Sequence, residues 1–124
     1  MKLRIRGNTV RIRISQSDMT QIVDHGVVVD SIDFALGERL EYRVEVVPSG
    51  AVRASYQGNS ISVALPQESV ENWSHSAEVS IEGKQLLNNG VNLTILVEKD
   101  FTCLTSRDGE DEEDLFPNPN KTKQ

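Results

Sequence analysis

The chain has 124 residues, 37% of them hydrophobic and 26% charged, with a formal net charge of -6 at pH 7 and a single cysteine. A domain of this length can bury a core without disulfides or metals, and the acidic balance argues against nonspecific nucleic-acid binding, which needs a surplus of cations. No apolar run approaches the ~18 residues of a membrane span, and no signal peptide follows the basic start. We therefore expect a cytoplasmic, single-domain protein that does not associate with membranes.

The first predicted element is a β-hairpin that turns at Gly7-Asn8. Apolar and cationic residues alternate on both sides of this pair, which is typical of strands joined by a two-residue loop. With that loop the apolar side chains share one face of the hairpin, and Arg4 lies opposite Arg11 on the other face. Like charges directly opposed are unfavourable. The predicted anion-binding residues are the five cations of this second face: Lys2, Arg4, Arg6, Arg11 and Arg13.

A helix is predicted over residues 16–25. Ser15 and Asp18 have the spacing of a capping box, and apolar residues follow them at helical spacing. Gly26 suits the left-handed residue that often ends a helix. These signals together predict both ends of the helix.

A second hairpin is predicted around Gly58-Asn59. Shifted by 51 positions, it superposes on the first hairpin, and the helix that follows each hairpin starts at Gln16 and at Gln67. Duplication of a strand-strand-helix-strand-strand unit and chance recurrence of a common turn both explain this match. The other predicted elements are extended segments over 28–34, 40–46, 79–81 and 93–97 and a helix over 66–73.

These elements define a mostly β, α+β domain with about eight strands and two short helices. Two turn signals, at Gly83-Lys84 and at 88–90, separate the last two predicted strands and leave their register open. We expect a strongly curved antiparallel sheet or a barrel. The globular domain is predicted to cover residues 1–104.

Residues 105–124 are predicted to form an acidic, disordered tail, because apolar periodicity stops there and the composition cannot repay the entropy of ordering. The segment 107–114 carries six acids and one arginine, which balances the basic start of the chain. Within the tail, Leu115 and Phe116 have the makeup of a short segment that docks into a groove, on a partner or on this same domain. An incidental apolar pair in a solvated tail is the alternative.

Three segments carry a resemblance: the basic stretch 2–8, the segment 98–104 and the acidic stretch 110–119, which contains Leu-Phe-Pro-Asn-Pro. Together they resemble a family of short bacterial single-domain proteins of uncharacterised function. The resemblance spans most of the chain. It implies a free-standing bacterial domain, and it implies no activity, substrate or site.

Three interpretations of the cationic hairpin face stay open. Arginines at alternate strand positions present donors in an array that suits phosphate or carboxylate, which indicates an anion site. The face could instead be solvated, with its repulsion tolerated through long side chains and salt. The third interpretation uses the acidic tail as an intramolecular counter-ion that covers the face.

The leading hypothesis is a small, non-enzymatic domain that binds an anionic ligand or protein partner through the cationic face, with its own acidic tail as a competitor. The alternative is a metal-dependent phosphohydrolase of polyphosphates or nucleoside triphosphates. A barrel that turned its charged residues inward would be similar to the triphosphate tunnel enzymes, although this chain lacks their opening strand of alternating glutamates. We find no catalytic triad, metal-ligand spacing or phosphate loop, so the sequence assigns no catalytic residue, metal or cofactor, and it predicts no oligomeric state.

Overall fold

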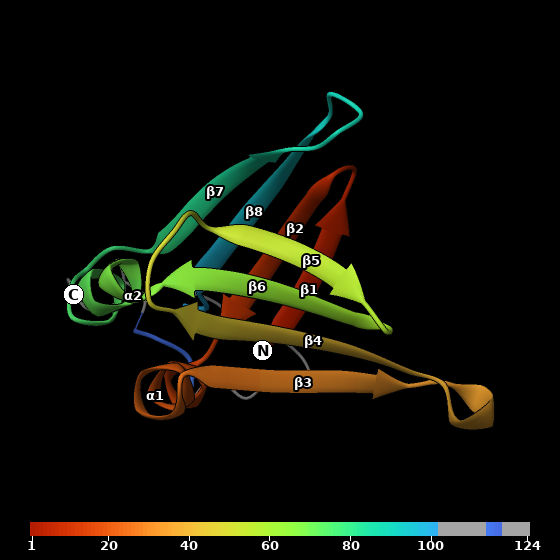
Figure 1. The fold of residues 1–124 in the computed structure, drawn as a ribbon. Helices are drawn as coiled ribbons and strands as arrows, with labels where there is room; N and C mark the ends of the chain where they lie inside the picture. The colour runs from red at the N-terminus through yellow and green to blue at the C-terminus, as the bar shows by residue number, and fades with distance from the viewer. Residues whose placement is uncertain (102–113, 118–124) are drawn as a thin grey trace.

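The computed structural model describes residues 1–101 and 114–117, which form two β-sheets with both helices at the same end of the molecule (Figure 1). The elements in chain order are β1 (Lys2–Arg6), β2 (Thr9–Ile14), α1 (Gln16–His25), β3 (Val27–Asp33), the short 3₁₀ helix η1 (Ala35–Gly37), β4 (Arg39–Val47), β5 (Arg53–Gln57), β6 (Ser60–Pro66), α2 (Gln67–Ser74), β7 (Ser80–Leu86) and β8 (Asn92–Lys99). The predicted mostly β, α+β composition with eight strands and two α-helices is therefore confirmed. No helix in the described residues is both long and apolar enough to cross a membrane.

Each half of the chain supplies one hairpin to each sheet. One sheet has the strand order β1-β2-β8-β7, and the other has the order β3-β4-β6-β5. The outer pairs are antiparallel, whereas the central pairs, β2 with β8 and β4 with β6, are parallel. The two strands of each parallel pair come from different halves of the chain, and α1 and α2 each connect one sheet to the other. The expectation of a strongly curved antiparallel sheet or a barrel is not confirmed: the described strands form two separate sheets, each with a parallel central pair, and these sheets do not close into a barrel.

The two halves of the chain have the same order of strands and α-helices, and only the first half contains η1. β1, β2 and α1 begin 51 positions before β5, β6 and α2, and β4 begins 53 positions before β8. The contacts between the halves repeat as well: the Thr94 amide donates to the Asn8 carbonyl over 3.0 Å, and the Glu41 amide donates to the Asn59 carbonyl over 2.9 Å. The molecule therefore contains an approximate two-fold repeat, in which the β1–β2 hairpin corresponds to the β5–β6 hairpin.

The predicted hairpin registers are confirmed along β1–β2 and over the residues of β5. Arg4 faces Arg11 in the first hairpin, and the second hairpin pairs its strands in the same way around its own two-residue turn. Gly7 and Gly58 both have a φ of 55°. Glycine adopts this left-handed conformation without the steric cost that a side chain adds, which explains why each turn begins with glycine.

Both ends of α1 lie where the sequence predicts them. The Asp18 amide donates to the Ser15 hydroxyl oxygen over 3.2 Å, and the Ser15 amide donates to the Asp18 carboxylate over 2.9 Å. Gly26 ends the helix with a φ of 78°. The predicted second helix is also confirmed, to within one residue at each end, and Pro66 directly precedes it.

Gly83 lies inside β7, and the chain turns instead near Gly90. A Cβ atom on Gly83 would lie 2.7 Å from two side-chain carbons of Val52. Glycine therefore lets the segment before β5 approach β7, where the Ala54 amide donates to Gln85 Oε1 over 3.1 Å. The glycine at this position reflects a close approach between the two sheets rather than a turn.

One hydrophobic core joins the apolar faces of both sheets and the two helices. Its fully buried side chains are Ile12, Ile14, Ile22, Val44, Val63, Leu65, Trp73, Ile95 and Val97. Because strand side chains alternate between faces, the charged residues of β1 and β2 lie on the side away from this core. Over residues 1–101 and 114–117 the two sheets do not form the closed, charged tunnel on which the phosphohydrolase alternative depended.

Candidate functional site

The five predicted anion-binding residues lie on the outer face of the β1–β2 hairpin. Arg4 lies opposite Arg11, and Lys2 lies opposite Arg13. We call this surface the basic face and define it as Lys2, Arg4, Arg6, Arg11 and Arg13. The parallel pairing of β2 with β8 places Glu98 beside Arg13, so β8 borders the basic face.

Glu98 holds two arginines of the basic face. Its Oε1 accepts a hydrogen bond from Arg11 Nε and another from Arg13 Nε, each over 2.8 Å, and its side chain is only 11% exposed. Burial raises the pKa of Glu98, but the hydrogen bonds and positive charges of the two arginines outweigh burial and hold the pKa below the ordinary value of a glutamate. Glu98 is therefore ionised at neutral pH and orders two guanidinium groups that would otherwise repel each other.

Replacing Glu98 by Gln should lower the free energy of unfolding at neutral pH by ~1 kcal/mol, a modest value because both arginines are partly exposed to solvent. The folded-state pKa of Glu98 is depressed, so its stabilisation is fully present above the unfolded-state pKa and is lost as the pH falls through the folded-state pKa. The difference between wild type and Glu98→Gln should therefore begin to shrink as the pH falls below the ordinary glutamate pKa of ~4.3, and it should vanish only below the depressed folded-state pKa. Urea denaturation over this pH range measures it, with the exposed Glu82→Gln as control. A difference that does not change with pH would contradict this account.

Asp100 supplies a second carboxylate at the end of β8. Its Oδ2 lies 2.7 Å from Lys2 Nζ, and its side chain is 4% exposed. Over the residues that the structure describes, two carboxylates meet five cations, so this part of the basic face is net positive. The sequence analysis named the cations but did not assign Glu98 or Asp100 to this face, because both carboxylates are far away along the chain and reach the hairpin only through the pairing of β2 with β8.

Arg4 and Arg6 are exposed on the outer half of β1. Among the residues that the structure describes, no carboxylate lies within ion-pair distance of either guanidinium. Together with Thr9 and Arg11 they line a shallow depression of about 150 Å³. These two arginines therefore offer hydrogen-bond donors to solvent or to a ligand.

The second hairpin has the same backbone and almost none of this charge. At the positions 51 residues further along, the five cations are replaced by Arg53, Ser55, Gln57, Ser62 and Ala64. The β5–β6 hairpin nevertheless pairs in the same register. The fold therefore does not need the cations in order to form this hairpin.

Residues 114–117 lie against the start of α1 and the end of β8. The Asp114 carbonyl accepts from the Gln16 amide over 2.8 Å, the Asp114 carboxylate accepts from the Ser17 amide over 3.1 Å, and the Ser17 hydroxyl also donates to this carboxylate. The hydrogen bond from the Ser17 hydroxyl is the main reason that the pKa of Asp114 lies below the ordinary value of an aspartate. A carboxylate is favourable at this position because the first N–H groups of a helix lack partners within the helix.

Leu115 and Phe116, the predicted docking pair, contact the same domain. Leu115 is 7% exposed. Phe116 meets Phe101 edge-on, with ring centroids 6.1 Å apart, and its amide donates to the Asp100 carbonyl over 2.9 Å. Residues 102–113 and 118–124 lie outside the described residues, so the predicted disorder of the tail stays a prediction.

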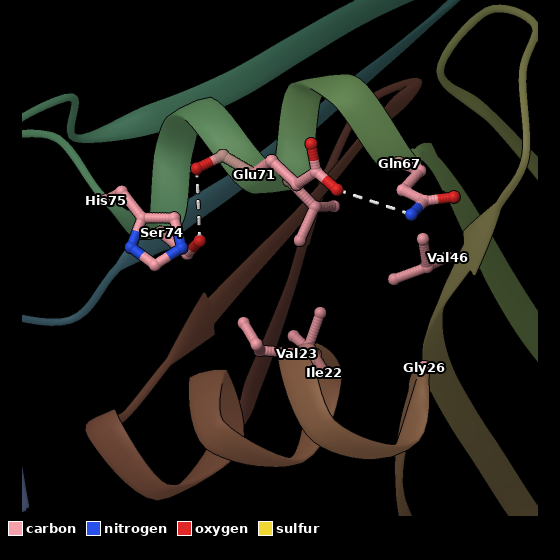
Figure 2. Close-up of a pocket in the computed structure, with 9 residues that line it drawn as sticks. Ile22, Val23, Gly26, Val46, Gln67, Glu71, Ser74 and His75 are labelled. Carbon is pink, nitrogen blue, oxygen red and sulfur yellow. Dashed lines mark hydrogen bonds between the residues drawn. The ribbon is translucent and has the colours of Figure 1, made fainter.

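A larger hollow lies between α1 and α2 (Figure 2). Its volume is about 560 Å³, and α1, α2 and β4 line it. Figure 2 shows Ile22 and Val23 pointing from α1 toward α2, with Glu71 on α2 and His75 directly after it. The sequence analysis missed this cleft, because it exists only where two helices far apart in sequence lie opposite each other. The one local signal was the placement of Val23 next to Ile22, which widens the apolar stripe of α1.

The fold and the basic face together define a small two-sheet α+β domain with one strongly cationic hairpin. The chain belongs to a family whose model matches residues 1–120 and which is described as a family of unknown function (DUF7009). No curated protein and no solved structure matches the chain.

Proposed function

We propose that this domain binds an acidic segment of a protein partner through the basic face. The contrast between the two halves of the chain carries the proposal: the fold builds the same hairpin twice, and five cations occupy the outer face of only one of them. Directly opposed like charges weaken a hairpin. Binding of an acidic partner explains why the chain keeps these mutually repelling cations. Folding does not explain them, because the second hairpin forms without them.

The spacing of the cations supports an extended, acidic ligand. Arg4 and Arg6 are alternate residues of β1 and lie about 6.8 Å apart along the strand. An extended peptide repeats its side chains on one face with the same period, so successive carboxylates could each meet one guanidinium, a geometry that favours two parallel hydrogen bonds. Glu98 already orders Arg11 and Arg13, which lowers the entropy that a partner must spend in ordering them.

The acidic run of this chain has the same chemistry as the proposed partner. Residues 107–113 follow β8, whose end meets the basic face at the Lys2–Asp100 ion pair. We therefore propose that the acidic run competes with a partner for the basic face. Neutralising this run should raise the affinity for a peptide added in trans.

The test uses the full chain and fluorescein-labelled hexaglutamate, followed by fluorescence anisotropy. We expect binding that weakens steeply between about 50 and about 300 mM NaCl, because exposed charge pairs are screened by salt. A variant with Asn or Gln at 108, 110, 111, 112 and 113 should bind about tenfold more tightly, while its docking residues Asp114 and Leu115 stay intact. Absence of binding by this variant at low salt would refute the proposal. Much tighter binding of tripolyphosphate than of hexaglutamate would replace the peptide with a phosphate ligand.

A further inference from the structure

The cleft between α1 and α2 has the size and composition of a small-molecule site. Its volume of about 560 Å³ lies within the range of ordinary ligand pockets. Ile22 and Val70 line it and belong to the buried core, at 1% and 4% exposure. Val23 stands on the α1 wall and is 49% exposed, so the cleft presents apolar surface that no side chain of the described residues covers.

The polar side chains of the cleft come from α2 and from His75 directly after it, and most of their free hydrogen-bonding capacity is acceptor capacity. Gln67 Nε2 donates to Glu71 Oε1 over 3.3 Å, and the Ser74 hydroxyl donates to the Glu71 carbonyl over 3.2 Å. These two hydrogen bonds use the side-chain donors of Gln67 and Ser74. They leave the second carboxylate oxygen of Glu71 and the amide oxygen of Gln67 available as acceptors. Figure 2 shows these groups on the α2 side, facing the apolar residues of α1 and β4.

The charge of the cleft is negative. Glu71 is a carboxylate, and within the described part of the chain neither a lysine nor an arginine lines the hollow. Glu71 lies on α2, and His75, the residue directly after α2, lines the same cleft. A ligand that pairs with these polar acceptors must carry hydrogen-bond donors and a positive charge. A ligand that also covers Val23 must have an apolar body.

We propose that the α1–α2 cleft binds a small organic cation, a primary ammonium group attached to an apolar body. The ammonium group donates to Glu71 and to the Gln67 amide oxygen, and the apolar body packs on Ile22 and Val23. This site is separate from the basic face and has the opposite charge. The two sites would therefore select different ligands.

The test is a titration of the full ¹⁵N-labelled chain, followed by NMR chemical shifts, with 2-phenylethylamine, hexylamine and cyclohexylmethylamine. The neutral comparator is 2-phenylethanol, which has the same aromatic body. We expect the amide shifts to concentrate at Val23, Gly26 and Glu71, and 2-phenylethylamine to bind about tenfold more tightly than the alcohol. Glu71→Gln should reduce the affinity for the amine to that for the alcohol. Glu68→Gln, an exposed acid of the same helix outside the lining, should leave it unchanged.

Three results would overturn this proposal. They are equal affinity for the amine and the alcohol in the wild-type chain, shifts that concentrate away from the cleft, and an equal loss of affinity in Glu68→Gln and Glu71→Gln. The first two results come from the wild-type chain alone. They decide the question even if Glu71→Gln does not fold.

Discussion

Replacing Arg4 by Ser and Arg6 by Gln should weaken hexaglutamate binding by about tenfold or more, while the hairpin stays folded. The new residues are those that occupy the equivalent positions, Ser55 and Gln57, in the second hairpin. Exposed ion pairs contribute up to about 1 kcal/mol each, so the loss of two accounts for a tenfold change in affinity. Anisotropy titration with the labelled peptide measures it, and the steepness of its salt dependence should fall as well.

Measuring the free energy of unfolding distinguishes a binding role of Arg4 from a structural one. Arg4 lies directly opposite Arg11, so Arg4→Ser removes a repulsion and should leave the free energy of unfolding unchanged or slightly higher. Arg53→Ser is the matched single control, because it removes one positive charge from the equivalent hairpin and should keep the affinity of wild type. The proposal fails if Arg53→Ser weakens binding as much as Arg4→Ser does, or if the double variant binds like wild type.

Replacing Leu115 by Ala should lower the free energy of unfolding by ~2 kcal/mol. Leu115 is 7% exposed although it lies beyond the predicted globular domain. Truncation of a buried leucine costs about 2–5 kcal/mol, and the lower value applies to a site at the edge of the core. Urea denaturation of the full chain, monitored through the buried Trp73, measures the change.

Leu86→Ala is the matched control for this measurement, because Leu86 is a leucine that is 72% exposed. Its substitution should change stability by less than about 0.5 kcal/mol. Asp114→Asn provides a second comparison: it removes the charge that the Ser17 amide and hydroxyl stabilise, and it should destabilise less than Leu115→Ala. If Leu115→Ala is no more destabilising than Leu86→Ala, residues 114–117 do not stay docked in solution.

The sequence predicted well wherever the deciding residues lie close together in the chain. The two Gly-Asn pairs predicted both hairpin turns, since a positive φ is a local requirement that glycine meets. Ser15 and Asp18 predicted the start of α1, because a capping box depends on side chains three positions apart. Gly83 was misleading because its role depends on Val52, a residue just before β5 that is distant along the chain and that no local pattern reveals.

The charged residues show the same difference between features that neighbouring residues decide and features that distant residues decide. The sequence predicted that the five cations share a face, because strand alternation and the turn register are sufficient for that inference. It did not assign to this face the carboxylate that organises them, since Glu98 reaches Arg11 and Arg13 only through the parallel pairing of β2 with β8. A solvated cationic strip and a strip ordered by a buried carboxylate are indistinguishable in the linear pattern.

The amino-acid sequence by itself determined the hairpins, the helix ends and the concentration of positive charge at the start of the chain, since each follows from periodicity and turn chemistry within a few residues. Only the tertiary structure decided that the strands form two sheets with parallel centres, that Glu98 and Asp100 meet the basic face, and that α1 and α2 enclose a cleft. These features join residues that are distant along the chain. Their contacts form because hairpins from both halves of the chain pack around one common core. No pattern of neighbouring residues in the sequence encodes that packing.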